Sequence, residues 1–227
     1  MSIQVIPTSL RTLLQSGFAH KRVKRRFRVD LSPSKLKRMP KLFLVKHSEP
    51  VVDLELPPSK WGLSDRGRQR ANSLAEYLAD RAIGGLFSTS EVKAVQTAEI
   101  VGKAAGLSLN VMHDLREHER DNTPIVDAET WRSTVIKSIR NQNEQIYGSE
   151  RVSTARKRFG AAIAQLMGPV GSDQVVAVVA HGTVISTFVA ELLDTDPVPI
   201  WKSLGLPGLV EIEWPHPAKI LAQLNFE

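Results

Sequence analysis

The segment QVVAVVA, Gln174–Ala180, is the most strongly β-like run in the chain, and His181 follows it directly. A second apolar run, KLFLVKH at Lys41–His47, also ends on a histidine. Short, uninterrupted apolar runs rich in β-branched residues indicate strands that are buried in a sheet. These two segments therefore predict a sheet that forms the centre of the protein.

Outside these runs the hydrophobic pattern alternates between helix-like and strand-like segments. Helix-like spacing covers approximately residues 64–80, 91–105, 127–141, 152–166 and 184–193. Further strand-like runs lie at 85–88, 107–112, 209–214 and 220–226. Ser64 is suited to cap the first helix, and Gly106 is suited to end the second. The alternation predicts an α/β fold, a three-layer αβα sandwich with a largely parallel central sheet.

Size and composition narrow the class of protein. A chain of 227 residues with 42% hydrophobic residues can bury the core of one α/β domain. No apolar run approaches the roughly 18 residues needed to cross a bilayer, so we expect no transmembrane segment. Cysteine is absent, which excludes disulfides, thiolate metal sites and cysteine nucleophiles. We therefore expect a cytoplasmic protein.

The positive charge is concentrated at one end of the chain. Residues 1–38 hold ten basic side chains and one acidic side chain, Asp30, which gives this segment a net charge of +9. Since the whole chain carries +6, residues 39–227 carry −3. The high isoelectric point therefore belongs to a basic leader and does not by itself indicate a nucleic-acid-binding domain.

Three interpretations fit this leader, residues 1–38. Its run from Lys21 to Arg28 is suited to contact nucleic acid or an anionic membrane by charge alone. Its arginine content, scarcity of acids and apolar helical face also suit an organelle presequence, which would change the predicted location. The third interpretation is a disordered or mis-assigned start, because Met39 stands directly before the first predicted strand. We adopt the third, with a domain at 39–227.

The two histidines occupy equivalent places in the predicted sheet. His47 and His181 each follow a buried strand and precede a small residue, Ser48 or Gly182. Ligands of open α/β sheets bind outside the carboxyl ends of the strands, so we expect both side chains at one site. Either histidine alone is more typical of a buried, hydrogen-bonded structural residue. Their repetition at equivalent strand ends favours a shared functional site.

Five segments, in order, resemble the motifs of one superfamily. They are Leu44–Glu49 (LVKHSE), Trp61–Gly67 (WGLSDRG), Ser88–Ala98 (STSEVKAVQTA), Leu115–Glu117 (LRE) and Val179–Thr183 (VAHGT). Each is similar to a motif of the histidine phosphatase, or phosphoglycerate mutase-like, superfamily: Arg-His-Gly, L-T-x-x-G, S-S-x-x-x-R-A-x-Q-T-A, L-x-E and S-H-G-G. The order and separations agree over about residues 41–193. The resemblance implies a phosphoglycerate mutase-like fold.

The resemblance also implies a chemistry and a set of roles. Hydrolysis of a phosphate monoester needs a nucleophile in line with the leaving group and stabilisation of the phosphoryl charge. On the family's pattern His47 attacks phosphorus to form a phosphohistidine, and His181 donates to the phosphoryl oxygens. Glu117 protonates the leaving alkoxide, which requires a raised carboxyl pKa. The implied substrate-binding residues are Lys46, Ser48, Lys93, Gly182 and Thr183.

Three positions depart from the family's pattern. Lys46 and Lys93 stand where the superfamily has phosphate-binding arginines, and Ser48 stands in place of the signature glycine. Lysine keeps the charge of arginine but loses its rigid bidentate fork. The alternatives for these residues are a strand lysine that extends outward for Lys46 and a solvated helix face for Lys93. The lysines indicate either a tuned site or a decaying one.

The resemblance favours a metal-independent phosphatase without a cofactor, acting on a small phosphorylated substrate. The stretch after Glu117 lacks the E-R-H-Y-G sequence of the mutases, which makes phosphoglycerate mutase activity the weaker alternative. A second alternative is a phosphate-ligand binding module that has lost turnover. Metal binding by His47 and His181 is disfavoured, because no third ligand has suitable spacing. The polar segment 117–148 is expected to overhang the site. The cations of this segment and of the residue before it are suited either to a second anionic group or to a solvated helix face: Arg116, Arg120, Arg132, Lys137 and Arg140.

Overall fold

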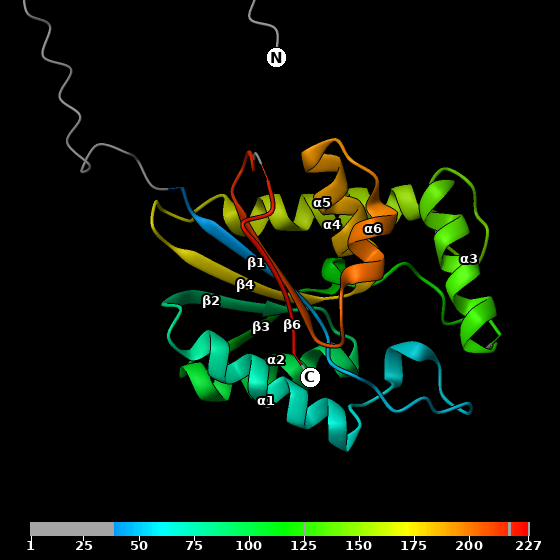
Figure 1. Ribbon diagram of the computed structural model, residues 1–227, viewed down its shortest axis with the longest axis horizontal. Helices are drawn as coiled ribbons and strands as arrows, with labels where there is room; N and C mark the ends of the chain where they lie inside the picture. The colour runs from blue at the N-terminus through cyan, green and yellow to red at the C-terminus, as the bar shows by residue number, and fades with distance from the viewer. Residues whose placement is uncertain (1–38, 125, 218, 227) are drawn as a thin grey trace, which may run out of the picture. The chain divides into compact units, whose positions relative to one another are not determined.

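The computed structural model describes residues 39–124, 126–217 and 219–226 (Figure 1). The basic leader, residues 1–38, lies outside the described residues, so its interpretations stay predictions. The described strands are β1 (Lys41–Lys46), β2 (Ile83–Ser88), β3 (Leu109–Val111), β4 (Val175–Ala180), β5 (Gly208–Glu213) and β6 (Ala222–Asn225). The α-helices are α1 (Asp65–Ala79), α2 (Val92–Ala105), α3 (Ala128–Arg140), α4 (Val152–Met167), α5 (Gly182–Leu193) and α6 (Pro197–Ser203). Two single 3-10 turns are η2 (Pro58–Lys60) and η3 (His113–Leu115).

The six strands form one mixed sheet in the order β3-β2-β4-β1-β5-β6. Strands β3, β2, β4 and β1 are mutually parallel, whereas β5 pairs antiparallel with both β1 and the edge strand β6. The prediction of a largely parallel sheet is confirmed. In the central pair, Lys46 of β1 lies opposite Ala180 of β4. The residues that follow these two positions therefore emerge side by side at one edge of the sheet.

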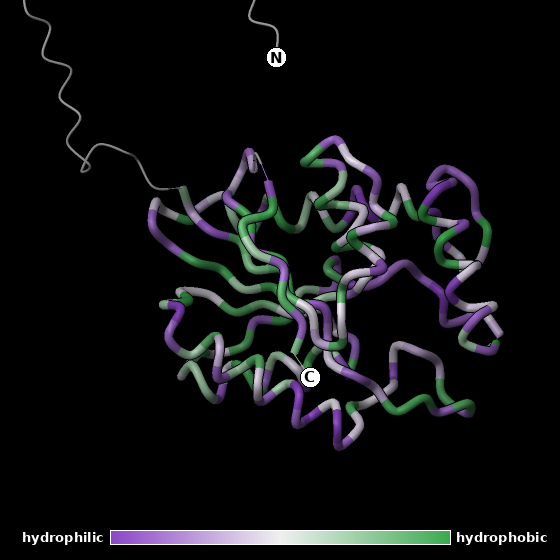
Figure 2. Tube along the Cα trace, in the orientation of Figure 1, coloured by the Kyte–Doolittle hydropathy of each residue, from purple (hydrophilic) through white to green (hydrophobic). Residues whose placement is uncertain are grey.

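Helices cover both faces of the sheet, as the predicted three-layer sandwich requires. In Figure 1, α1 and α2 lie on one side of the strands and α4 and α5 on the other. Side chains of β1 alternate between two cores: Leu42 and Leu44 pack with α4 and α5, and Phe43 and Val45 pack with α1 and α2. Figure 2 shows the central strands as the most hydrophobic part of the trace. Because both faces of the central strands are covered by helices, nearly every side chain in these strands is apolar, which explains the uninterrupted apolar runs.

Several element boundaries differ from the sequence prediction. Strand β2 begins at Ile83, two residues before the predicted start, because Gly84 and Gly85 continue the strand without contributing apolar side chains. The edge strands β3 and β6 are shorter than predicted. Helix α6 was not predicted, since its sequence, PVPIWKS, carries two prolines. Pro197 occupies the first turn, where a missing N–H costs nothing, and Asp196 caps the helix.

Helix α3 lies apart from the sheet and packs on α6. Val135 and Ile139 of α3, Tyr147 and Val198 form a separate buried cluster there. The predicted helix at 127–141 is confirmed, and Asp127 caps it by accepting from the backbone N–H groups of Glu129 and Thr130. Among the described residues, no helix is both long enough and apolar enough to cross a bilayer.

Candidate active site

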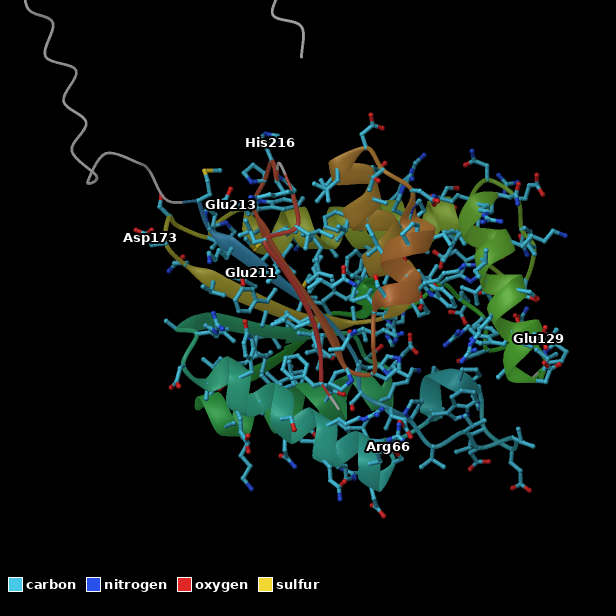
Figure 3. All side chains as sticks on the ribbon, viewed as in Figure 1. Arg66, Glu129, Asp173, Glu211, Glu213 and His216 are labelled. Carbon is cyan, nitrogen blue, oxygen red and sulfur yellow. The ribbon has the colours of Figure 1, made fainter. Side chains whose placement is uncertain are left out.

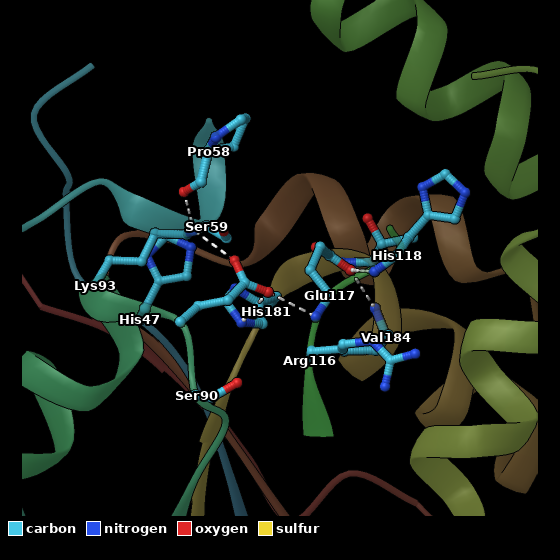
Figure 4. A network of polar contacts seen from close by, with 12 residues as sticks. His47, Pro58, Ser59, Ser90, Lys93, Arg116, Glu117, His118, His181 and Val184 are labelled. Atoms are coloured by element: carbon cyan, nitrogen blue, oxygen red, sulfur yellow. Dashed lines mark hydrogen bonds and ion pairs between the residues drawn. The ribbon is translucent and has the colours of Figure 1, made fainter. Parts of the chain in front are cut away.

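The two histidines meet at the end of the central strands, as the sequence predicts. The backbone N–H of His47 continues the ladder by donating to the carbonyl of Ala180 at 3.0 Å. The ring centroids of His47 and His181 lie 5.1 Å apart, at an interplanar angle of 61°. Figure 4 shows the two rings together with Lys93 and Glu117. Parallel β1 and β4 thus bring residues 134 positions apart in sequence to one point.

His47 is held as a neutral imidazole with one free nitrogen. Its Nδ1 lies 2.7 Å from the carbonyl oxygen of Ser48. A carbonyl can only accept, so Nδ1 carries the proton and Nε2 keeps its lone pair. Burial, followed by the neighbouring His181 and Lys93, holds the pKa of His47 well below its usual value. The ring therefore has the protonation state that a nucleophile needs.

Lys93 is buried at the site, on the first turn of α2. Its side chain is 1% exposed, which contradicts the alternative of a solvated helix face. Nζ donates to the carbonyl of Pro58 at 2.7 Å and to Oε2 of Glu91 at 2.6 Å. Burial lowers the pKa of Lys93, and the carboxylate of Glu91 opposes that shift.

Lys46 also turns toward the site and does not extend outward from its strand. Its Nζ donates to the carbonyl of Leu204 at 3.0 Å. Burial lowers the pKa of Lys46 to about 8, with Glu117 opposing the shift and Arg120 adding to it. Both lysines that replace the superfamily's arginines therefore line the same cavity as His47.

A buried carboxylate that the sequence analysis did not single out connects the site. Besides its contact with Lys93, Glu91 places Oε1 3.0 Å from Nε2 of His181. The same Oε1 accepts from the backbone N–H of Glu117 at 2.9 Å. Burial would raise the pKa of Glu91, but His181 and Lys93 outweigh it and hold the pKa well below the usual value. The sequence signal for Glu91 is its place directly before α2, inside the quoted motif Ser88–Ala98.

His181 is fully buried beside this carboxylate. The approach to Glu91 is close but poorly aligned, and neither ring nitrogen has a well-aligned hydrogen-bond partner among the described residues. A buried ring nitrogen without a partner is costly in a folded protein, and such groups occur at binding sites. His181 is therefore placed to donate to a group that enters beside His47.

Glu117 sits against the first turn of α5. Its carboxylate accepts from the backbone N–H groups of His118, Thr183 and Val184, at 2.9, 3.1 and 3.3 Å. Burial would raise the pKa of Glu117, but His181, Arg120 and these N–H donors outweigh it, so the pKa is lowered. The expectation of a raised pKa is therefore wrong for the protein without substrate. The physical reason is that His181 and Arg120, and after them the backbone N–H donors, stabilise the ionised carboxylate.

Of the three remaining predicted site residues, Gly182 and Thr183 line the cavity, and Ser48 holds the backbone next to it. Gly182 and Thr183, at the start of α5, line the cavity beside His47. Ser48 does not line it: its hydroxyl donates to the carbonyl of Gly67 at 2.7 Å, and its N–H donates to Oγ1 of Thr97 at 3.0 Å. Ser48 therefore fastens the loop after His47 to α1 and α2.

Gly67 explains why this loop and α1 approach so closely. A Cβ atom at Gly67 would lie 2.0 Å from the carbonyl oxygen of Glu49, which no side chain can do. Ser64 caps the same helix by accepting from the N–H of Gly67 at 2.9 Å, as predicted. The glycine of the quoted motif thus holds the backbone that follows His47.

His47 borders a cavity of about 420 Å³, whereas His181 and Glu91 lie behind its lining. The polar floor is made by His47, Lys46, Lys93, Glu117 and the start of α5. Arg120 also faces this cavity, with its guanidinium carbon 4.4 Å from the centre of the Trp131 ring. The arrangement provides a neutral imidazole, three cationic side chains, a buried carboxylate and a helix start, which together suit an anionic phosphoryl group.

Comparison with protein families agrees with this geometry. The family model for the histidine phosphatase superfamily, branch 1, matches residues 42–227. The chain belongs to the histidine phosphatase superfamily. Its fold is phosphoglycerate mutase-like, and the resemblance seen in the five sequence motifs is confirmed.

Curated relatives include both phosphatases and mutases. The chain is 29% identical over 163 residues to a glucosyl-3-phosphoglycerate phosphatase of Mycolicibacterium vanbaalenii, covering 67% of this chain and 71% of that protein. It is 26% identical over 179 residues to a probable phosphoglycerate mutase, GpmB, of Salmonella paratyphi A, covering 74% and 80%.

Solved structures share the fold at low sequence identity. One is a mycobacterial glucosyl-3-phosphoglycerate phosphatase in complex with VO3, with a TM-score of 0.64, 20% identity, and coverage of 82% of this chain and 99% of that one. Another is a phosphoserine phosphatase from Entamoeba histolytica in complex with 3-phosphoglyceric acid, with a TM-score of 0.65, 19% identity, and coverage of 82% and 96%.

This member of the histidine phosphatase superfamily carries little positive charge on the cavity lining beyond Lys46 and Lys93. Of the five cations proposed for a second anionic group, only Arg120 lines the cavity; the others are Arg116, Arg132, Lys137 and Arg140. Arg132, Lys137 and Arg140 are exposed on α3, and Arg116 contacts Asp114 at 3.2 Å. For Arg132, Lys137 and Arg140 the structure therefore agrees with the alternative of a solvated helix face. The periodicity of α3 turns its apolar face inward and its cations to solvent.

Among residues 39–124, 126–217 and 219–226, no group of three or more histidine, aspartate or glutamate side chains is placed to hold a metal ion.

Proposed function

We propose that this chain is a metal-independent phosphatase that hydrolyses a phosphate monoester through a phosphohistidine at His47. The observation that carries the proposal is the state of His47. Its Nδ1 proton is committed to the carbonyl of Ser48, its pKa is depressed by burial, and its ring borders a cavity floored by Lys46 and Lys93. A neutral imidazole of fixed tautomer next to cations is the arrangement that nucleophilic attack on phosphorus requires.

The reaction has two phosphoryl transfers. In the first, Nε2 of His47 forms a bond to phosphorus while the bond from phosphorus to the ester oxygen breaks, and Glu117 gives its proton to the departing oxygen. In the second, water attacks phosphorus, Glu117 takes a proton from that water, and the bond to Nε2 breaks. Phosphate leaves and both residues return to their starting states. Lys46, Lys93 and Arg120 stabilise the negative charge throughout.

Glu117 acquires its proton as substrate binds. A phosphoryl dianion beside Glu117 places like charge next to the carboxylate, which raises the pKa of that carboxyl. The hydrogen bonds from the start of α5 hold its position meanwhile. On this proposal Glu117 is ionised before substrate binds and becomes protonated only in the complex with substrate.

The cavity supports a phosphatase over a mutase. A phosphoglycerate substrate carries a carboxylate in addition to its phosphoryl group, and each anion needs its own cationic partners. Arg120 is the single arginine that lines the described cavity, and it is stacked on Trp131. A phosphoryl group that binds the floor would already be close to it.

A second candidate function is a phosphate-ligand binding module with lost or slow turnover. One specific observation favours it: Glu91 pairs with Lys93 at 2.6 Å and approaches His181 at 3.0 Å, so two groups assigned to phosphate binding already face a carboxylate. The presence of His47, His181 and Glu117, the three residues assigned to the reaction, close together in the structure supports turnover. A test of catalysis separates the two functions.

The test is phosphate release from 4-nitrophenyl phosphate in buffer that contains EDTA, with wild type, His47→Ala and His216→Ala. His216 is exposed and lies on the turn after β5, away from the site (Figure 3), so its replacement controls for histidine loss as such. Turnover by wild type and His216→Ala, with none by His47→Ala, supports the phosphatase. Undiminished turnover by His47→Ala excludes His47 as the nucleophile. Tight vanadate binding with no turnover by wild type supports the binding module.

A further inference from the structure

The upper walls of the cavity have a chemistry opposite to that of its floor. The charged lining residues gather around His47, whereas Trp61, Trp131 and Trp201 form much of the wall. Pro50, Pro58, Pro124 and Leu206 add further apolar surface. Any group attached to a phosphoryl at the floor must therefore extend between aromatic and aliphatic side chains.

Hydrophobic side chains that soluble proteins usually bury are exposed at the mouth of this cavity. The described residues include seven exposed large hydrophobic side chains. Two of them, Val52 and Val126, line the cavity, and three more, Val51, Leu54 and Leu56, belong to the same loop as Val52. Val52 and Val126 line the cavity while remaining 56% and 44% exposed. In Figure 2 part of the loop between β1 and α1 is correspondingly hydrophobic. Clustered exposure at a cavity mouth marks a binding surface, whereas scattered exposure does not.

The volume of the cavity and the stacking of Arg120 on Trp131 are also those of a site for an apolar organic group. At about 420 Å³ the cavity is far larger than a phosphate ion and falls within the range of pockets that bind small organic molecules. The guanidinium of Arg120 lies over the Trp131 ring, which extends the flat wall. Flat walls of this kind suit stacking against an aromatic ring.

We infer that the substrate is a phosphate monoester of an apolar, ring-containing alcohol or phenol, and that Val52 and Val126 help select it. This inference rests on the proposed function and names its substrate class. The phosphoryl group binds at the floor, and the leaving group occupies the apolar walls. Esters of polyols and of ammonium-bearing alcohols are poor substrates, because their polar groups lose water and most of the wall offers them no partner. The polar side chains of the wall are Arg120 and Thr123.

The test compares two esters of primary alcohols, naphthylmethyl phosphate and glycerol 1-phosphate, so that leaving-group acidity differs little. We expect kcat/KM of wild type to be at least about a hundredfold higher for the naphthylmethyl ester, since burial of two fused rings far exceeds a few methylenes. Val52→Asn together with Val126→Asn lowers that ratio about tenfold by raising KM for the apolar ester alone. Val111→Asn is the matched control, because Val111 is 54% exposed and does not line the cavity.

A binding measurement separates failure of the inference from failure of the proposed function. Naphthylmethylphosphonate and methylphosphonate, which cannot be hydrolysed at a P–O ester bond, are titrated calorimetrically into wild type and the same variants. Equal or better turnover of glycerol 1-phosphate overturns the inference and leaves the phosphatase intact. Absence of all turnover, with the naphthyl phosphonate still preferred, overturns the phosphatase and keeps the apolar selectivity. Equal affinity for both phosphonates overturns the inference whether or not turnover occurs.

Discussion

Glu91 and Lys93 form a buried ion pair inside the proposed phosphoryl site, with Oε2 and Nζ 2.6 Å apart. Lys93 is 1% exposed and Glu91 is 10% exposed at the side chain. Because the same carboxylate also approaches His181, it offsets positive charge that would otherwise attract a phosphoryl dianion. On the proposed function, a bound phosphoryl group therefore has to compete with the carboxylate of Glu91 for these cationic groups.

Replacing Glu91 by Gln is expected to tighten vanadate binding by about tenfold or more. Loss of a nearby negative charge removes repulsion, and about 1.4 kcal/mol corresponds to a factor of ten. The same change should lower the melting temperature, because Lys93 loses its buried partner. Calorimetric titration with vanadate and a thermal melt measure the two effects. Weaker vanadate binding in this variant would show instead that Glu91 organises Lys93 and His181 for the anion.

Anion binding is expected to weaken as the pH rises through about 8, the pKa of Lys46. Lys46 is a cation below this pH and neutral above it, and a phosphate monoester is already a dianion there because its second pKa is about 6. The decline should appear in kcat/KM, which reports the free enzyme, more than in kcat, because bound substrate raises the pKa of the lysine.

Lys46→Arg supplies the control for this pH dependence. Arginine stays charged over the whole range, so its profile should remain flat where that of wild type falls. A decline that is identical in both proteins would assign the titration to another group.

Glu117→Gln should lower kcat/KM for an alkyl phosphate by roughly 10²–10⁴-fold, because kcat/KM reports the first transfer, in which a poor leaving group needs the proton of Glu117. The loss should be much smaller for 4-nitrophenyl phosphate, whose leaving group departs as a stable anion. Glu119→Gln is the matched control, since Glu119 is a nearby acid that does not line the main cavity. Equal losses of kcat/KM on both esters would mean that Glu117 does not protonate the leaving group.

The sheet could be predicted where burial leaves a local pattern. Strands β1 and β4 lie between two helical layers, so nearly every side chain is apolar. The start of β2 was hidden because Gly84 and Gly85 have no side chain to bury. Helix α6 was hidden because its prolines resemble a loop until Asp196 is seen to cap it.

The candidate site was predictable where it depends on strand ends. His47 and His181 are neighbours because β1 and β4 are parallel and in register, which the two apolar runs already indicate. The role of Glu91 depends on how the start of α2 meets the ends of β1 and β4, a tertiary contact that no local pattern records. The direction of the Glu117 pKa could not be predicted for the same reason, since the backbone donors come from distant α5.

Direct capture of the phosphoenzyme tests the central claim, that His47 carries the phosphoryl group. Wild type is mixed with 4-nitrophenyl phosphate in EDTA, denatured in alkali, which preserves phosphohistidine, and digested for mass spectrometry. We predict one added phosphoryl group on the peptide that contains His47, which is lost on brief acid treatment and absent from His47→Ala. A steady-state turnover with no phosphopeptide, or with the label on another residue, would contradict the account.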